Sequence, residues 1–174
     1  MRRLILLRHA KSDRPAGVAD HERPLNPRGR RAAPAVGAHV AEQGFRPDLA
    51  LVSTAARTRE TWEAIAAALG NPETRWQREI YEAPAQRILD VVRGAPDAAA
   101  TVIVVGHNPG LGDLAASLAG EGARKDLARL ATEFPTAAYA VIAFEAEGWG
   151  AIGPGQGRLE RFVRPRDIDP DLGG

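Results

Sequence analysis

The sequence contains no cysteine, so disulfide bonds, thiolate metal sites and a cysteine nucleophile are all excluded. It also lacks a long hydrophobic run: a membrane-spanning helix needs about 18 consecutive apolar residues, and no stretch of the chain approaches that length. Arg8 interrupts the short apolar stretch near the N-terminus, which is therefore not typical of a secretory signal. We expect a soluble, cytoplasmic protein that has no membrane partner.

The sequence also lacks a large excess of positive or negative charge. The formal net charge is +1, from 23 basic and 22 acidic residues, and the basic residues are scattered among the acids. Nucleic acid is therefore not an expected partner. A chain of 174 residues, 44% of them hydrophobic, suits one compact domain with a sizeable core. We place this domain at residues 1–166 and expect 167–174, which is acidic and contains Pro and Gly, to be a loose polar tail.

Short apolar runs alternate with segments of helical periodicity along most of the chain. The predicted strands are 4–7, 49–52, 76–81 and 101–105, and the predicted helices are 28–43, 55–69, a helix from Pro84 onward, and 111–118. Ser53 or Thr54 is expected to cap the second helix. Two further runs, 139–144 and 158–163, predict an antiparallel pair. This order predicts an α/β fold, a three-layer α/β/α sandwich whose central sheet is mostly parallel, with an antiparallel strand or pair at the C-terminus.

Polar residues that can bind an oxyanion follow three of the predicted strands. Arg8 and His9 follow the first strand, Arg57 lies just beyond the second, and His107 follows the strand 101–105. Ligands of open α/β sheets bind outside the carboxyl ends of the strands, where these residues would meet. Guanidinium forks suit phosphate, and imidazoles can donate a hydrogen bond or attack. Each residue alone would more often be structural, but their joint placement predicts a phosphate site.

Several sequence blocks resemble a known family in order and spacing. The triplet Arg8-His9-Ala10 is similar to the RHG signature of the histidine phosphatase superfamily, with Ala10 in place of the usual Gly. More narrowly, the chain resembles the SixA-type phosphohistidine phosphatase branch. The blocks that carry this resemblance are RHAKS at 8–12, Asp20 with RPL at 23–25 and Arg28-Gly29, STAARTRET at 53–61, YEA at 81–83, VGHNPG at 105–110 and FPT at 134–136. The resemblance covers nearly the whole chain and implies a phosphoglycerate mutase-like fold.

The resemblance implies a role for each of the four strand-end residues. His9 would be the nucleophile that takes the phosphoryl group, and Arg8, Arg57 and His107 would hold its oxygens. The chemistry of these residues agrees, because a neutral imidazole is a competent nucleophile and phosphoryl transfer asks mainly for positioning and charge stabilisation. The chain offers no persuasive set of metal ligands. We therefore expect neither a metal nor another cofactor.

The roles of the neighbouring polar residues stay open. Glu82 is either the acid that protonates the leaving group or a first-turn acid that favours the dipole of the next helix. Ser12 could assist in binding phosphate, and Asn108 either donates to phosphate or, as we favour, supports the turn. Asp20 and Arg23 are expected to pair and to order the long loop that contains them. Two further histidines, at positions 21 and 39, are expected to be surface or packing residues.

The function that these observations favour is a metal-independent phosphatase that acts on phosphohistidine in a protein, or on a small phosphorylated compound, through a phospho-His9 intermediate. The absence of a large insertion predicts a shallow site that a protein side chain can reach. One alternative is a phosphoglycerate mutase-like sugar-phosphate enzyme, and another is a phosphate-binding module without turnover. The substrate, whether a phosphorylated protein or a small phosphorylated molecule, is the expected partner, and a monomer is favoured.

Overall fold

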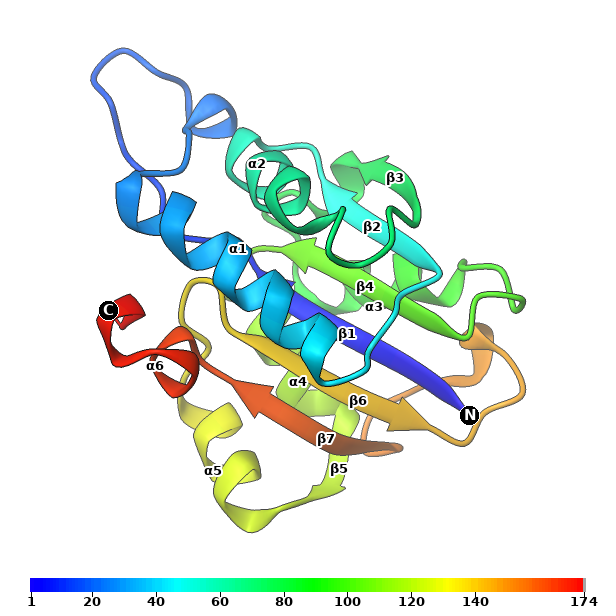
Figure 1. Ribbon diagram of the computed structural model, residues 1–174. Coiled ribbons are helices and arrows are strands. Elements are labelled where there is room, and N and C mark those ends of the chain that lie inside the picture. Colours follow the sequence, from blue (N-terminus) through cyan, green and yellow to red (C-terminus); the bar gives the residue numbers. More distant parts are fainter. Residues whose placement is uncertain (174) are drawn as a thin grey trace.

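The computed structural model describes residues 1–173, and within them the strands form one mixed sheet in the order β3-β2-β4-β1-β6-β7-β5 (Figure 1). The strands are β1 (Arg2–Arg8), β2 (Leu49–Ser53), β3 (Glu73–Gln77), β4 (Thr101–Gly106), β5 (Ala119–Gly122), β6 (Tyr139–Phe144) and β7 (Gly157–Val163). The neighbours β3, β2, β4 and β1 are parallel, whereas β6 is antiparallel to both β1 and β7. The predicted mostly parallel sheet with a late antiparallel pair is confirmed.

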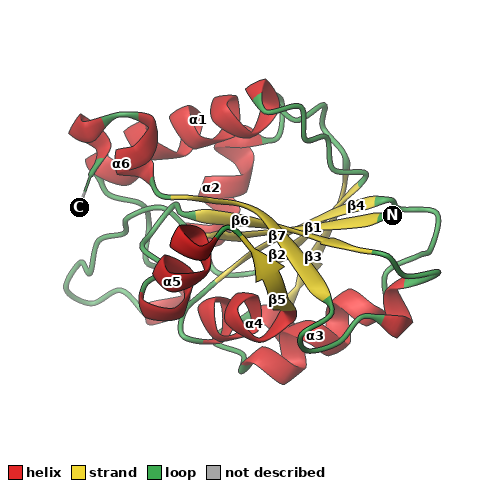
Figure 2. Cartoon of the chain, turned by 90° about the horizontal axis from the view of Figure 1, so that it is seen from below, coloured by secondary structure: helices red, strands yellow, loops and turns green. Residues whose placement is uncertain are grey.

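Helices cover both faces of this sheet. They are α1 (Pro27–Glu42), α2 (Ala56–Ile65), α3 (Ala85–Arg93), α4 (Gly110–Leu118), α5 (Arg124–Thr132) and the short α6 (Pro165–Ile168). Seen along the sheet, α1, α2 and α6 lie on one side and α3, α4 and α5 on the other, which gives the predicted three layers (Figure 2). Among residues 1–173, no helix has the length and apolar character needed to cross a bilayer.

The central strand β1 shows why its sequence is a continuous apolar run. Ile5 and Leu7 pack with Val36 of α1 and other residues of the first layer, whereas Leu6 packs with Leu111 of α4 on the opposite face. All of these side chains are buried. A strand that is covered on both faces needs apolar residues at every position, because neither face meets water. The core therefore holds β1 and its carboxyl end in a fixed place.

Two local predictions are wrong in detail. The third strand was expected at 76–81, but β3 ends at Gln77, which pairs with Ser53, the last residue of β2. The chain then turns into a 3-10 helix, Arg78–Ile80, which buries Ile80 under the sheet. Neither Ser53 nor Thr54 caps α2, since its N-cap is Ala55, without a side-chain hydrogen bond. Ser53 has a different partner, described below.

The segment between β4 and β6 and the C-terminal segment contain structure that the sequence pattern did not predict. Edge strand β5 and helix α5 are largely exposed, and α5 buries only Leu130 fully, so their apolar pattern is weak. From Asp167 a loose tail was predicted. Instead, α6 and a 3-10 helix, Pro170–Leu172, place Ile168 and Leu172 against the core beside α1, and Arg28 donates a hydrogen bond to the Gly173 carbonyl.

Candidate active site

The carboxyl ends of β1 and β4 bring two histidines together. Arg8 pairs with Gly106 in the parallel register, and the His9 amide donates to the Gly106 carbonyl at 3.1 Å. His9 and His107 therefore leave adjacent strands at the same level, and their ring centroids lie 5.3 Å apart. Arg57, in the first turn of α2, lines the same cleft. The predicted convergence of two arginines and two histidines at one sheet edge is confirmed.

These four residues lie in a cleft of about 290 Å³ that carries an excess of positive charge. Its basic residues are Arg8, Lys11, Arg14, Arg23 and Arg57, its acidic residues are Asp20 and Glu82, and its other lining residues are His9, Ser12, His107, Asn108 and Thr136. Lys11, Arg14 and Glu82 are exposed, whereas the two histidines are buried. The cleft is thus basic in its depth and suits a small anion.

His9 is held as a neutral imidazole of defined tautomer. Its Nδ1 lies 2.7 Å from the Ala10 carbonyl oxygen, which can only accept, so Nδ1 carries the proton and Nε2 keeps its lone pair. Burial lowers the pKa of His9 to about 3, and the charges of Arg8, Arg57 and Arg23 act in the same direction. The ring is therefore uncharged at neutral pH and can act as a nucleophile at Nε2.

Thr61 of α2 fixes the turn that carries His9. The Ala10 amide donates to Thr61 Oγ1 at 3.0 Å, and that hydroxyl donates in turn to the Arg57 carbonyl at 2.7 Å. Thr61 is buried, so this link between β1 and α2 is shielded from water. One side chain thereby connects the backbone next to His9 with the backbone of Arg57.

The second histidine, His107, is hydrogen-bonded to Ser53, the last residue of β2. His107 Nε2 lies 2.7 Å from Ser53 Oγ, and both side chains are buried. Burial lowers the pKa of His107 to about 3, and the nearby His9 and Arg57 lower it further. Within the described residues, His107 Nδ1 has no hydrogen-bond partner. An unpartnered buried nitrogen beside a basic cleft is a group that a bound oxyanion can satisfy.

Arg8 is anchored on one side only. Its Nη1 donates to the Phe134 carbonyl at 3.0 Å, and its buried Nε has no partner among residues 1–173. Burial, followed by the repulsion from Arg57, lowers the pKa of Arg8. Arg57 is itself buried, and its two terminal nitrogens both reach Asp20, Nη1 to the carbonyl at 2.8 Å and Nη2 to Oδ2 at 3.2 Å. Two guanidinium groups thus face one small cleft.

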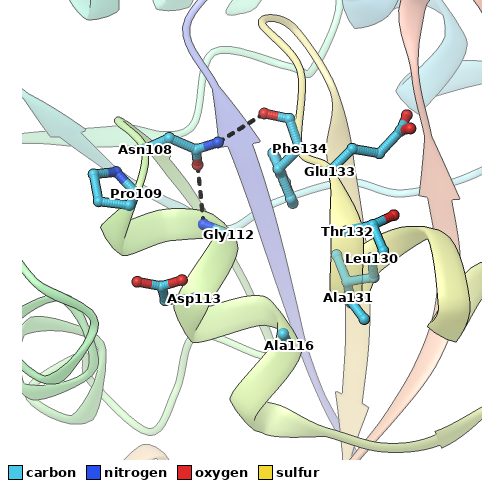
Figure 3. Close-up of a pocket in the computed structure, with 10 residues that line it drawn as sticks. All are labelled: Asn108, Pro109, Gly112, Asp113, Ala116, Leu130, Ala131, Thr132, Glu133 and Phe134. Carbon is cyan, nitrogen blue, oxygen red and sulfur yellow. Dashed lines mark hydrogen bonds between the residues drawn. The ribbon is translucent and has the colours of Figure 1, made fainter.

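Asn108 makes two contacts of the kind that the favoured support role requires, and it also lines the cleft. Its Nδ2 donates to the Phe134 carbonyl at 2.8 Å, and its Oδ1 accepts from the Gly112 amide in the first turn of α4 at 3.0 Å (Figure 3). The Phe134 carbonyl therefore accepts hydrogen bonds from both Asn108 and Arg8. Asn108 lines both the active-site cleft and a second cavity of about 170 Å³ between α4 and α5, whose lining residues Figure 3 shows.

The remaining predicted residues lie around the mouth of the cleft. Ser12 Oγ accepts from Arg23 Nη2 at 2.7 Å, so its hydroxyl supports the loop. Asp20 and Arg23 pair as expected, at 2.8 Å. Glu82 lines the cleft and is exposed, with a φ of 50°. The reading of Glu82 as a first-turn acid is wrong, because the first turn of α3 contains no acidic residue.

Two contributions to the site were missed by the sequence interpretation. The sequence pattern predicts Ser53 or Thr54 as a helix cap and assigns Tyr81 no chemical role. Tyr81 donates its hydroxyl to Asp20, and its ring meets the His107 ring edge-on, with centroids 5.5 Å apart. His21 bonds to Thr54 beside this group. The one available signal was that Ser53 comes directly after the predicted strand 49–52 and that Tyr81 ends the predicted strand 76–81.

Comparisons with known proteins place the chain in a family. The profile of the histidine phosphatase superfamily (branch 1) matches residues 4–82. A solved structure of a candidate phosphohistidine phosphatase SixA from Agrobacterium tumefaciens superposes with a TM-score of 0.80 and 31% identity, over 94% of this chain and 98% of that one. This chain belongs to the histidine phosphatase superfamily. Its seven-stranded α/β sheet, within residues 1–173, is the phosphoglycerate mutase-like fold of the SixA-type branch.

Two further relatives show the same similarity along nearly the full length. A second candidate SixA structure, from Nakamurella multipartitia, has a TM-score of 0.79 and 31% identity and covers 94% of this chain and 96% of that one. An uncharacterized protein of Mycobacterium tuberculosis is 36% identical over 163 residues, which are 92% of this chain and 100% of the relative. The superfamily assignment therefore applies to the domain as a whole and not to the N-terminal motif alone.

Proposed function

We propose that this histidine phosphatase hydrolyses phosphohistidine in a protein, or a small phosphorylated compound, through a covalent intermediate on His9. The observation that carries the proposal is the state of His9: a buried, neutral imidazole whose Nδ1 is bound to the Ala10 carbonyl and whose Nε2 is unprotonated. A residue that only bound phosphate would do better as a protonated donor. A neutral nitrogen between two arginines is suited to attack.

The surrounding residues have separate tasks in this proposal. In the first displacement, His9 Nε2 forms a bond to phosphorus while the leaving nitrogen or oxygen departs, and in the second, water cleaves the P–N bond and releases inorganic phosphate. Arg8, Arg57 and His107 stabilise the equatorial oxygens, because their donors are fixed before the substrate binds. The net positive charge of the cleft supports the binding of a dianion.

The substrate preference follows from the leaving group. Imidazole, with a reference pKa of about 6.5, leaves far more readily than an alkoxide. Glu82 is exposed on the rim and is the acid that would assist esters with poorer leaving groups. A strong dependence on an acid is therefore not required for phosphohistidine. This comparison, together with the basic rim of Lys11 and Arg14, supports a phosphorylated protein as the main substrate class.

The test compares a phosphohistidine-containing protein with a panel of phosphorylated metabolites by kcat/KM, in the presence of EDTA. We expect turnover without added metal, the highest kcat/KM for the phosphohistidine protein, and phosphate trapped on His9 after rapid quenching without acid. His9→Ala should abolish turnover, whereas His39→Ala, a control on α1 at a histidine that does not line the cleft, should retain it. Phosphate affinity without turnover would indicate a binding module, and a requirement for metal would contradict the mechanism.

A further inference from the structure

Asp20 contacts two arginines of the cleft, Arg23 and Arg57, although the proposed reaction gives it no role. It begins the 3-10 helix Asp20–Glu22, in the long connection between β1 and α1. Its Oδ1 accepts from Arg23 at 2.8 Å, and its Oδ2 accepts from Arg57 Nη2 at 3.2 Å and from the Tyr81 hydroxyl. Its carbonyl accepts from Arg57 Nη1 at 2.8 Å. One residue therefore holds both terminal nitrogens of Arg57.

The charge of Asp20 is unusual for its place. It lines a cleft that binds an anion in the proposed function, and a carboxylate there repels the substrate. The hydroxyl of Tyr81 and the guanidinium of Arg23, followed by that of Arg57, hold the pKa of Asp20 well below its usual range, so it stays ionised. A permanent negative charge at this position is useful to the enzyme only if Asp20 has a favourable effect on the site that exceeds its repulsion of the anionic substrate.

Tyr81 extends the group from Arg57 to His107. The Tyr81 ring lies 5.9 Å from Arg57 Cζ and meets the His107 ring at 76°. Burial and the bond to Asp20 raise the pKa of Tyr81 to about 12, so its hydroxyl remains a donor. Asp20, Tyr81 and Arg57 thus form one connected group against His107.

We infer that Asp20 is a positioning residue, which aims the Arg57 guanidinium and, through Tyr81, steadies His107 for the transferring phosphoryl group. The inference rests on the proposed function, because it names how an oxyanion-binding residue of that site is oriented. Asp20 balances the repulsion between Arg57 and Arg8, which share the cleft. Its carboxylate accepts from Arg57 Nη2 and its backbone carbonyl accepts from Nη1, and the two bonds together fix the plane of the guanidinium.

The competing explanation is that Asp20 merely pins the loop. The loop has other attachments, which do not involve Asp20. The Asn26 amide donates to the Lys11 carbonyl at 2.9 Å, and the Leu25 amide donates to Glu60 at 3.0 Å. Arg23 also reaches the Asp13 carbonyl, at 2.9 Å. Because these bonds remain when Asp20 is changed, Asp20→Asn is expected to fold, and a thermal melt of each variant checks this.

The experiment is a double-mutant cycle on the full chain, with orthovanadate affinity as the readout, since vanadate copies the geometry of phosphoryl transfer. In the wild-type background, Asp20→Asn should weaken vanadate binding by about tenfold, the lower end of the cost of losing a partner that orients an active group. In the Arg57→Ala background the same change should weaken binding by no more than about threefold, because Arg57 no longer needs orienting and the lost support of His107 through Tyr81 is offset by the lost repulsion. The dependence of most of the Asp20→Asn effect on Arg57 is the signature of positioning.

Three controls make the cycle decisive. Asp13→Asn removes the same charge from an exposed position of the same loop, outside the cleft lining, and should change vanadate affinity less than twofold. Tyr81→Phe removes one donor to Asp20 and should weaken binding by about threefold, which tests the inference even if an Asp20 variant does not fold. Wild-type hydrolysis of an aryl phosphate, measured separately, tests the proposed function.

Each outcome has one reading. Weakening by the same factor in both backgrounds means that Asp20 is a structural pin, and tightening in both means that it is only a repulsive charge; either result overturns the inference. No effect in the wild-type background overturns it as well. The expected loss of affinity that depends on Arg57, found in a protein without turnover, would support Asp20 as the residue that positions Arg57 and would reject the phosphatase proposal alone.

Discussion

Acidification from pH 6.5 to 4.5 should destabilise the folded protein strongly, because the fold buries two neutral histidines. His9 and His107 have a pKa of about 3 in the folded chain, and an unfolded histidine has one of about 6.5. In that window the unfolded chain binds more protons than the folded chain, so the free energy of unfolding falls as the pH falls. The loss is absent above pH 6.5 and complete near pH 3.

The size of the effect follows from the same pKa values. A difference of one pH unit costs about 1.4 kcal/mol for each ring, so two rings over two units lose about 5 kcal/mol by pH 4.5. Both rings are buried, with 6% and 4% exposure, so solvent screens them little. Small domains have a total stability of about 5–15 kcal/mol, which makes this loss easy to measure. Asp20, whose pKa is held well below its usual range, adds to the loss mainly below pH 4.5, where the unfolded carboxyl group takes up a proton.

The assay is urea unfolding at pH 7.0 and 4.5, followed by tryptophan fluorescence in phosphate-free buffers of equal ionic strength. His9→Asn and His107→Asn cannot take up a proton on unfolding, so each should remove about half of the acid-induced loss. The dependence of stability on pH is compared, not the stability itself, since either substitution also changes packing. A wild-type protein that is equally stable at both values, or variants that keep the full loss, would refute the idea that both rings are neutral and desolvated.

Three further predictions concern the cleft and the turn behind it. Replacement of Arg57 or Arg8 by Ala should lower kcat by at least ~100-fold in steady-state assays, as expected for a lost preorganised donor, with only partial rescue by Lys, and a near-normal rate would place that arginine outside the reaction. Glu82→Gln should slow an alkyl phosphate by about 100- to 10,000-fold but affect phosphohistidine much less, and equal losses on both substrates would exclude Glu82 as the leaving-group acid. In Gly29→Ala, the new Cβ would lie 2.1 Å from the Lys11 carbonyl oxygen, so a loss of about 1–3 kcal/mol in urea unfolding is expected together with reduced activity, and wild-type values of both would contradict this contact.

The sequence by itself determined the strands that build the site. The apolar runs that became β1, β2 and β4 are buried on both faces, and such strands must be apolar at nearly every position, so they stand out locally. The topology rule for open α/β sheets then predicted that the polar residues after these runs would meet at one edge. His9 and His107 lie there, although their roles in catalysis remain predictions.

The tertiary structure alone decided which neighbours surround these residues. Ser53, which with Thr54 is one of two predicted caps, contacts His107 instead, because it is the last residue of a strand whose end lies beside β4. Asp20 and Tyr81 are 61 positions apart and come from a loop and from the end of the connection after β3. Their contact depends on how these segments pack at the sheet edge, which no local period encodes. Periodicity reports which face of an element is buried, whereas partners across the site are set by the packing of whole elements.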